Sequence, residues 1–157
     1  TFRYSNWSLR TTFVYRTGFK VINAARMGLE KMYDTTNQSS AVNWRWRKNG
    51  DVTEIPRALY NAGYNWLGSD RYVEDASFLR ARNVQLGYTL PQSLTKKVFI
   101  QRLRVYAQAE NLFTLTKYTG CDPEVTGGNS GYGTEVGIDR GVYPQNRTFT
   151  FGVNVNF

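Results

Sequence analysis

The last ten residues of the chain constrain its fold most. From Thr148 to Phe157 the sequence reads T-F-T-F-G-V-N-V-N-F, in which apolar residues alternate strictly with small or polar ones. The apolar positions are Phe149, Phe151, Val153, Val155 and Phe157. A period of two over about ten residues is typical of a β-strand with one apolar face, either in a half-buried soluble sheet or in the wall of a transmembrane barrel. Both interpretations are open at this point.

Three further segments show the same alternation, so we expect four antiparallel strands. They cover residues 2–15, 77–90, 102–114 and 148–157. The connections between them are long, short and long, at 17–75, 91–101 and 115–147. Outer-membrane β-barrels combine short periplasmic turns with long extracellular loops in this way. We therefore predict that 91–101 is a periplasmic turn and that the other two connections are extracellular loops.

Composition excludes most catalytic chemistry. The chain has no His, which removes Ser-His-Asp and Cys-His pairs and the commonest zinc sites. Its carboxylates are scattered without a pair at glycosidase spacing, so we predict no enzyme, no catalytic residue and no metal site. The single cysteine, Cys121, is interpreted as an incidental thiol.

The net charge of +8 is dispersed along the chain, so nucleic acid is not expected as a partner. The excess of basic residues lies near the strands, whereas 17–75 is close to balanced. Basic residues at strand ends suit the anionic head groups of outer-membrane lipid and lipopolysaccharide, and they suit solvent equally well.

The two long loops contain the candidate binding residues. Exposed aromatic rings pack against sugar rings or peptide side chains, although they also pack a loop on itself. The aromatic candidates are Trp44, Trp46, Tyr60, Trp66, Tyr118 and Tyr143. Asn23 is predicted to cap a short helix that begins at Ala24. Four acidic residues of the second loop are a weak candidate for a Ca²⁺ site, with a solvated acidic loop as the alternative: Asp122, Glu124, Glu135 and Asp139.

In combination, the motifs of the chain resemble the SusC/RagA family of TonB-dependent outer-membrane transporters. The resemblance covers nearly the whole chain and rests on the segments 45–57, 69–80, 86–91, 103–106, 110–114, 120–125 and 143–149, followed by the final strand. Bacterial outer-membrane barrels as a class commonly end on such a strand, whose terminal aromatic residue directs barrel insertion, so the five apolar residues of 148–157 are the expected assembly signal. Two departures are Cys121, where an aromatic residue is usual, and Ala76, where Gly is expected.

The resemblance implies that the chain is the C-terminal part of a barrel of 22 strands that is filled by an N-terminal plug. It also implies a multi-pass location in the bacterial outer membrane, a SusD-like surface lipoprotein as lid, and energy from the TonB complex through the missing N-terminal part. The imported nutrient is expected to be an oligosaccharide or an oligopeptide, with no cofactor. The residues expected to face the lumen or plug are Arg10, Gln85, Arg104, Gln108 and Glu110. The alternative is a soluble all-β carbohydrate-binding module, which needs a closed core that four strands do not provide.

Overall fold

The computed structural model describes residues 1–65, 67–125 and 137–157, apart from the side chain of Val98. The chain divides into two compact units. The sheet unit comprises Thr1–Thr17, Ser77–Thr116 and Gln145–Phe157, and the loop unit comprises Gly18–Ala76 and Lys117–Pro144. Among the described residues, no helix is long and apolar enough to span a membrane.

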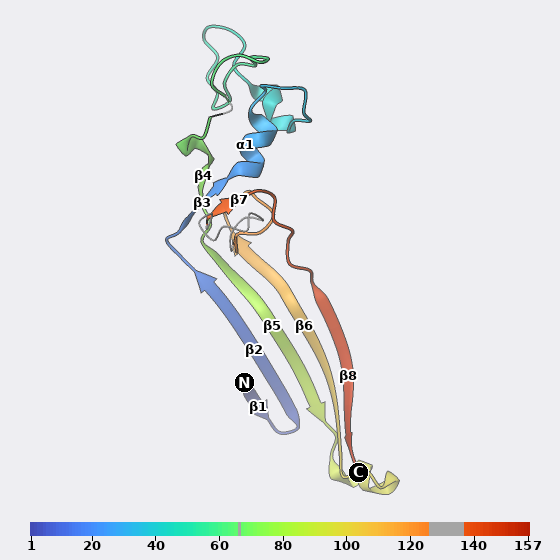
Figure 1. Ribbon diagram of the computed structural model, residues 1–157. Helices are drawn as coiled ribbons and strands as arrows, with labels where there is room; N and C mark the ends of the chain where they lie inside the picture. Colours follow the sequence, from blue (N-terminus) through green and yellow to red (C-terminus); the bar gives the residue numbers. More distant parts are fainter. Residues whose placement is uncertain (66, 126–136) are drawn as a thin grey trace. The chain divides into compact units, whose positions relative to one another are not determined.

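The sheet unit is a single antiparallel sheet of five strands (Figure 1). The strands are β1 (Phe2–Tyr4), β2 (Trp7–Arg16), β5 (Phe78–Thr89), β6 (Arg102–Thr116) and β8 (Thr148–Asn156). Within the sheet their order is β1-β2-β5-β6-β8, so each strand pairs with the strands of this sheet that precede and follow it in the sequence, as in an up-and-down meander. The mostly antiparallel architecture predicted from the alternation is therefore observed.

The first predicted strand, 2–15, is a hairpin instead of one strand. Tyr4 pairs with Trp7 and Phe2 pairs with Leu9, so the chain reverses at Ser5 and Asn6. Ser5 has a φ of 51°, the left-handed conformation that a two-residue hairpin loop requires. The sheet unit consequently has one strand more than the sequence predicts.

Turns and long connections leave the sheet at opposite ends. The segment between β5 and β6 forms two short helical turns, α2 (Gln92–Thr95) and η3 (Lys96–Val98), at the same end as the β1–β2 hairpin. At the other end, Arg16 pairs with Phe78, and Phe78 pairs with Thr116. Both long connections therefore begin from this second end.

The register sorts the side chains onto two faces. One row of neighbours on the apolar face consists of Leu9, Leu86, Ala107 and Phe151. The adjacent row on the polar face consists of Arg10, Gln85, Gln108 and Thr150. Because opposite residues in a ladder point to the same side, the strands keep apolar and polar residues apart over four neighbouring strands.

A bulge interrupts the register of β5. Against β2, Arg82 is the extra residue, since Ala81 and Asn83 are paired with the consecutive Phe13 and Thr12. Against β6 the excess is reversed, because two residues, Asn111 and Leu112, lie between the partners of Ala81 and Asn83. Arg80, the third residue of β5, is buried, and its Nε donates to Thr114 Oγ1 at 3.0 Å. The bulge leaves the faces unchanged beyond it, because the rings of Phe13 and Phe113 remain neighbours on the apolar face at 6.5 Å.

The loop unit contains a second, small sheet that joins the two long connections. Its order is β4-β3-β7, with β3 (Lys20–Asn23) in the centre, β4 (Val73–Asp75) antiparallel to it and β7 (Ile138–Asp139) parallel to it. The helix α1 (Ala24–Glu30) follows β3, and the Asn23 side chain caps it by accepting from the Arg26 amide at 2.9 Å, which confirms the predicted cap. Two 3₁₀ turns, η1 (Ser40–Trp44) and η2 (Asp70–Tyr72), complete the described elements.

The small sheet has its own core. Val21 of β3 and Ala76 after β4 pack with Tyr118 and Val125 of the second connection, with Phe19 and Val142 at the margin. The two loops, predicted separately from the sequence, thus fold together as one unit.

Candidate functional site

The structure brings the five candidate lumen-facing residues together on the polar face of the sheet. Arg10, Gln85 and Gln108 lie in one row, and Arg104 and Glu110 lie on the same face of β6. That this face lines a lumen stays a prediction from the sequence.

A chain of hydrogen bonds links four of these side chains from a cation to an anion. Arg104 Nη2 donates to Gln85 Oε1 at 3.4 Å, and Gln85 Nε2 donates to Gln108 Oε1 at 2.9 Å. Gln108 Nε2 in turn donates to a carboxylate oxygen of Glu110 at 2.8 Å. Every amide points the same way, so the row is polarised in one direction and each bond strengthens the next.

Two glycines make room for large side chains that lie flat on this face. A Cβ at Gly87 would lie 2.5 Å from Arg104 Nη2, and a Cβ at Gly152 would overlap the ring of Tyr106. Arg104 also donates to Ser8 Oγ at 3.1 Å. The small residues of the polar face therefore hold the Arg104 guanidinium in a fixed position.

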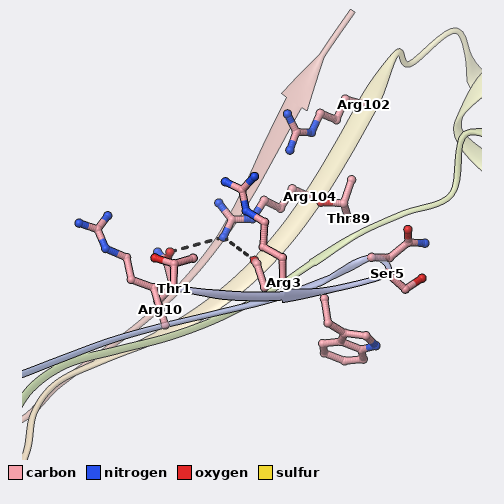
Figure 2. Close-up of a pocket in the computed structure, with 11 residues that line it drawn as sticks. Thr1, Arg3, Ser5, Arg10, Thr89, Arg102 and Arg104 are labelled. Carbon is pink, nitrogen blue, oxygen red and sulfur yellow. Dashed lines mark hydrogen bonds between the residues drawn. The ribbon is translucent and has the colours of Figure 1, made fainter.

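Arginines gather at the turn end of the polar face. Arg3, Arg10, Arg102 and Arg104 line one hollow of about 420 Å³ (Figure 2). The remaining lining residues carry no acidic side chain, so the hollow is strongly electropositive.

The opposite, apolar face is exposed and bordered by aromatic residues. Phe149, Phe151 and Val153 expose 61%, 80% and 59% of their surface. Trp7 and Tyr88 pack together near the turn end, with ring centroids 4.7 Å apart, and Tyr15 lies near the other end. Trp7 and Tyr15 are separated by eight steps of β2, roughly 27 Å along the strand, or about 20 Å in height at the usual tilt. The spacing is close to the height of an apolar band between two aromatic girdles.

The loop aromatics differ in accessibility. Trp44, Tyr60 and Tyr143 are exposed, whereas Trp46 is half-buried and Trp66 lies outside the described residues. Trp44 borders an open hollow of about 410 Å³ that is also lined by Arg45, Arg47 and Val52. Its backbone oxygen accepts from Thr53 Oγ1 at 2.6 Å, which closes this part of the loop on itself.

Tyr118 is buried, unlike the other described aromatic candidates, so the structure does not favour it as a ligand contact. It is buried in the core of the loop unit, and its hydroxyl donates to Asp139 Oδ2 at 2.6 Å. Burial raises the pKa of the Tyr118 hydroxyl, and its bond to the Asp139 carboxylate raises the pKa further. A tyrosine between polar neighbours gives no sequence signal of this burial, which depends on the small sheet.

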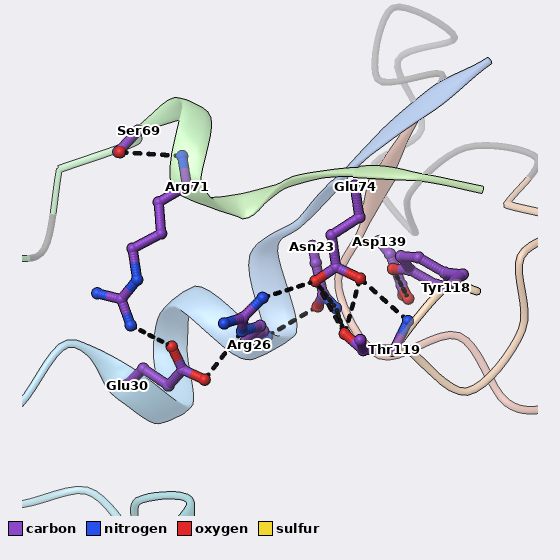
Figure 3. A network of polar contacts seen from close by, with 9 residues as sticks. All are labelled: Asn23, Arg26, Glu30, Ser69, Arg71, Glu74, Tyr118, Thr119 and Asp139. Carbon is purple, nitrogen blue, oxygen red and sulfur yellow. Dashed lines mark hydrogen bonds and ion pairs between the residues drawn. The ribbon is translucent and has the colours of Figure 1, made fainter. Parts of the chain in front are cut away.

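Glu74, in the first long connection, forms hydrogen bonds to both long connections within the loop unit (Figure 3). One carboxylate oxygen accepts from Arg26 Nη1 at 3.1 Å and from Asn23 Nδ2 at 3.2 Å, and the other accepts from the Thr119 amide at 3.0 Å. Burial alone raises the pKa of Glu74, but the hydrogen bonds from Thr119, Arg26 and Asn23 outweigh it and lower the pKa below its usual value. Sequence reasoning did not identify this residue, because its partners lie about fifty residues away on either side.

Glu30 forms the second part of the same network. Its side chain is buried between Arg26, whose Nε lies 2.9 Å from one carboxylate oxygen, and Arg71, which pairs with the other oxygen. The hydrogen bond to Glu30 has the largest effect on Arg26 and raises the pKa of its guanidinium. Arg26 and Arg71 are thus neutralised by acidic residues of their own unit.

Two of the candidate Ca²⁺ residues, Asp122 and Asp139, bind backbone amides of their own loop. Asp139 Oδ1 accepts from the amides of Gly141 and Val142, and Asp122 Oδ1 accepts from the Glu124 amide. Glu135 lies outside the described residues. Among the described residues, no three His, Cys, Asp or Glu side chains form a metal-binding group. The Ca²⁺ site stays a prediction.

The sequence is similar to those of named receptors. No family model matches the chain. It is 32% identical over 99% of its length to TonB-dependent receptor P3 of Formosa agariphila, covering 15% of that protein. It is 39% identical over 71% of its length to receptor P39 of the same species, and 40% identical over 64% to TonB-dependent receptor SusC of Bacteroides thetaiotaomicron, covering 11% and 9% of them. The chain therefore spans about one seventh of the length of receptor P3, and a smaller share of receptor P39 and of SusC.

Solved structures give the same match. The chain aligns over 97% of its length with the RagAB peptide transporter, at a TM-score of 0.77 and 28% identity, and covers 16% of that chain. The RagAB peptide importer in its "closed-closed" and "open-open" states matches with TM-scores of 0.78 and 0.75. The named relatives are receptors and importers, none of them an enzyme.

Proposed function

Because this chain belongs to the SusC/RagA family of TonB-dependent receptors, we propose that it forms part of the barrel wall and outer loops of an outer-membrane nutrient importer. In this proposal it is the C-terminal part of the barrel, β8 is the closing strand, and Phe157 belongs to the assembly signal. The importer takes up oligosaccharides or oligopeptides together with a SusD-like surface lipoprotein. The TonB complex acts on a plug outside these residues.

The separation of the two faces of the sheet carries the proposal. An apolar face with aromatic borders suits lipid, and a polar face with a hydrogen-bonded row suits a wet lumen. A soluble protein would have to cover the exposed Phe149, Phe151 and Val153, and no other element of the sheet unit does so. In lipid, the outer edges of β1 and β8 also require further strands, because unpaired backbone groups are not tolerated there.

The lengths of the connections support the proposed orientation. The β1–β2 hairpin and the 90–101 segment are short and suit the periplasmic side, while the two long connections suit the cell surface. On that surface the exposed Trp44, Tyr60 and Tyr143 are the proposed contacts to substrate or lipoprotein.

The first test is the intact mass of the protein that contains this sequence, purified from detergent-extracted outer membranes. The relatives are several times longer, so we expect a species of roughly 100 kDa or more that needs detergent. A stable detergent-free species of 18.0 kDa would contradict the barrel and favour a soluble carbohydrate-binding module.

The second test addresses the loops. Trp44→Ala should weaken binding of substrate or lipoprotein about tenfold if its ring is a contact, because an exposed Trp at a binding surface often contributes more than 1 kcal/mol. The half-buried Trp46 is compared through Trp46→Ala. Uptake and lipoprotein binding that are unchanged in either variant would remove that residue from the proposed contacts.

A further inference from the structure

We infer that Arg3, Arg10, Arg102 and Arg104 form a docking site for carboxylate groups from a segment of the same receptor that lies outside these 157 residues. The inference rests on the proposed function, since it assumes that the polar face is turned toward the interior of a barrel. It adds the chemistry of the surface that packs against this face.

The first argument is an unbalanced charge. The sheet unit contains ten Lys and Arg residues and a single acidic residue, Glu110, so its formal net charge is +9. Glu110 accepts its hydrogen bond from Gln108 and lies further along β6 than the arginine hollow. Within the described part of the chain, Arg3, Arg10 and Arg102 make no ion pair and no side-chain hydrogen bond.

The second argument is that one of the cations is fixed in place. Arg104 lies over Gly87 and donates to Ser8 and Gln85, and both of these acceptors are neutral. Its position is therefore determined while its charge is not compensated. Guanidinium groups present several donors in a plane that matches a carboxylate, and a site of this kind binds best when its donors are already placed.

The third argument identifies the occupant. The four arginines come from three strands, β1, β2 and β6, around an open hollow, so their charges are spread over a surface that is better matched by several carboxylates on a polypeptide than by one small anion. The chain spans only 15–16% of its relatives, which leaves most of the receptor available to cover this face. Like charges gathered in one hollow repel one another unless opposite charges are brought to them.

Zero-length cross-linking tests the site in the full receptor. Arg10→Lys/Arg102→Lys keeps the charge and introduces amines that a water-soluble carbodiimide couples only to carboxylates in direct contact. We expect mass spectrometry to find amide links from positions 10 and 102 to Asp or Glu residues outside the 157-residue chain. The native ion pair between Lys31 and Asp34 is the internal positive control. Arg57→Lys, at an exposed arginine of the loop unit, is the control variant that should give no such link.

The result that would overturn the inference is a Lys31–Asp34 link without any link from positions 10 and 102. A second measurement separates a mobile anion from a polypeptide. If inorganic phosphate raises the melting temperature of the wild-type receptor, if Arg10→Gln/Arg102→Gln abolishes that rise, and if no cross-link forms, the site binds a free anion and the polypeptide assignment fails. Both measurements use protein whose intact mass has already identified it as a full-length receptor that needs detergent. A negative result therefore contradicts the arginine docking site and does not contradict the proposed function.

Discussion

The two units of the chain differ in net charge and in how far their charged side chains are paired. The loop unit has ten basic and eleven acidic residues, for a net charge of −1, whereas the sheet unit has a net charge of +9. In the loop unit, Arg26, Lys31 and Arg71 are paired with Glu30, Glu74 or Asp34. In the sheet unit, three exposed arginines of the polar face have no partner among the described residues.

The same contrast holds for apolar residues. The loop unit buries Val21, Ala76, Tyr118 and Val125 in a core of its own. The sheet unit instead exposes one face of Phe and Val residues and leaves two edges unpaired. The described part of the loop unit thus has a core of its own, whereas the sheet unit has an uncovered apolar face, which the proposed function assigns to lipid.

The largest effect is expected from a charge on the apolar face. Phe149→Arg places a cation near the middle of the proposed lipid-facing band, where Arg destabilises a barrel by about 2–4 kcal/mol. We expect loss of the folded, heat-modifiable form of the receptor in outer membranes on unboiled gels. Thr148→Arg, one residue away on the polar face opposite Glu110, is the matched control and should fold normally. Equal folding of both variants would mean that the apolar face does not meet lipid.

The next effect tests the self-sufficiency of the loop unit. Glu74→Gln removes a carboxylate that accepts bonds from Arg26, Asn23 and Thr119, so we expect a local loss of about 1–3 kcal/mol. Hydrogen exchange of the receptor should become faster around Asn23 and Thr119 and remain unchanged in β5 and β6. Glu54→Gln, at an exposed position, is the control. Faster exchange that spreads equally through the sheet would show that the two units do not behave independently.

A smaller effect is expected from a methyl group on the polar face. Gly152→Ala meets the Tyr106 ring and forces it to move, at a cost of about 1 kcal/mol. The melting temperature of the detergent-solubilised receptor should fall by a degree or two, and Thr150→Ala on the same face should leave it unchanged. Identical melting of the two variants would indicate that Tyr106 does not lie over Gly152.

The smallest effect is a pH dependence confined to one unit. The folded pKa of Glu74 lies below its ordinary value of 4.5, so its contribution is present above that pH and is lost as the pH falls through the lower, folded pKa. Exchange rates, corrected for intrinsic pH dependence, should rise around Thr119 below about pH 4.5 in the wild type. Glu74→Gln should already be open and show no such transition. A wild type without this transition would remove Glu74 as the acid-sensitive connection.

The strands of the sheet unit could be predicted from the sequence because the alternation of apolar and polar residues is a local signal. The same signal also marks the β1–β2 hairpin, which was predicted as a single strand. Apolar residues occupy even positions at Phe2 and Tyr4 and odd positions from Trp7 onward, and this change of parity at Ser5 and Asn6 indicates a two-residue turn. The five candidate residues of the polar face share a face for the same reason, since their positions follow from the alternation alone.

The loop unit was mostly not predictable. β3 and β7 pair over two residues that lie more than one hundred positions apart, so neither strand is long enough to give a pattern. Glu74 gains its hydrogen-bond partners, and Tyr118 its buried position, only when those strands pair. The residues next to them in sequence give no pattern that predicts either role. The Asn23 cap was predicted because its signal lies within one helical turn.

The joint sheet of the two long connections sets a rule for exchanging loops between receptors. β3 and β4 belong to the first connection and β7 to the second, and Glu74 and Thr119 bond across them. A graft that transfers residues 18–76 alone would bring β3 without its parallel neighbour and Glu74 without Thr119. Substrate preference should therefore be transplanted by moving both segments as a pair, and receptors of this kind are expected to diversify the two in concert.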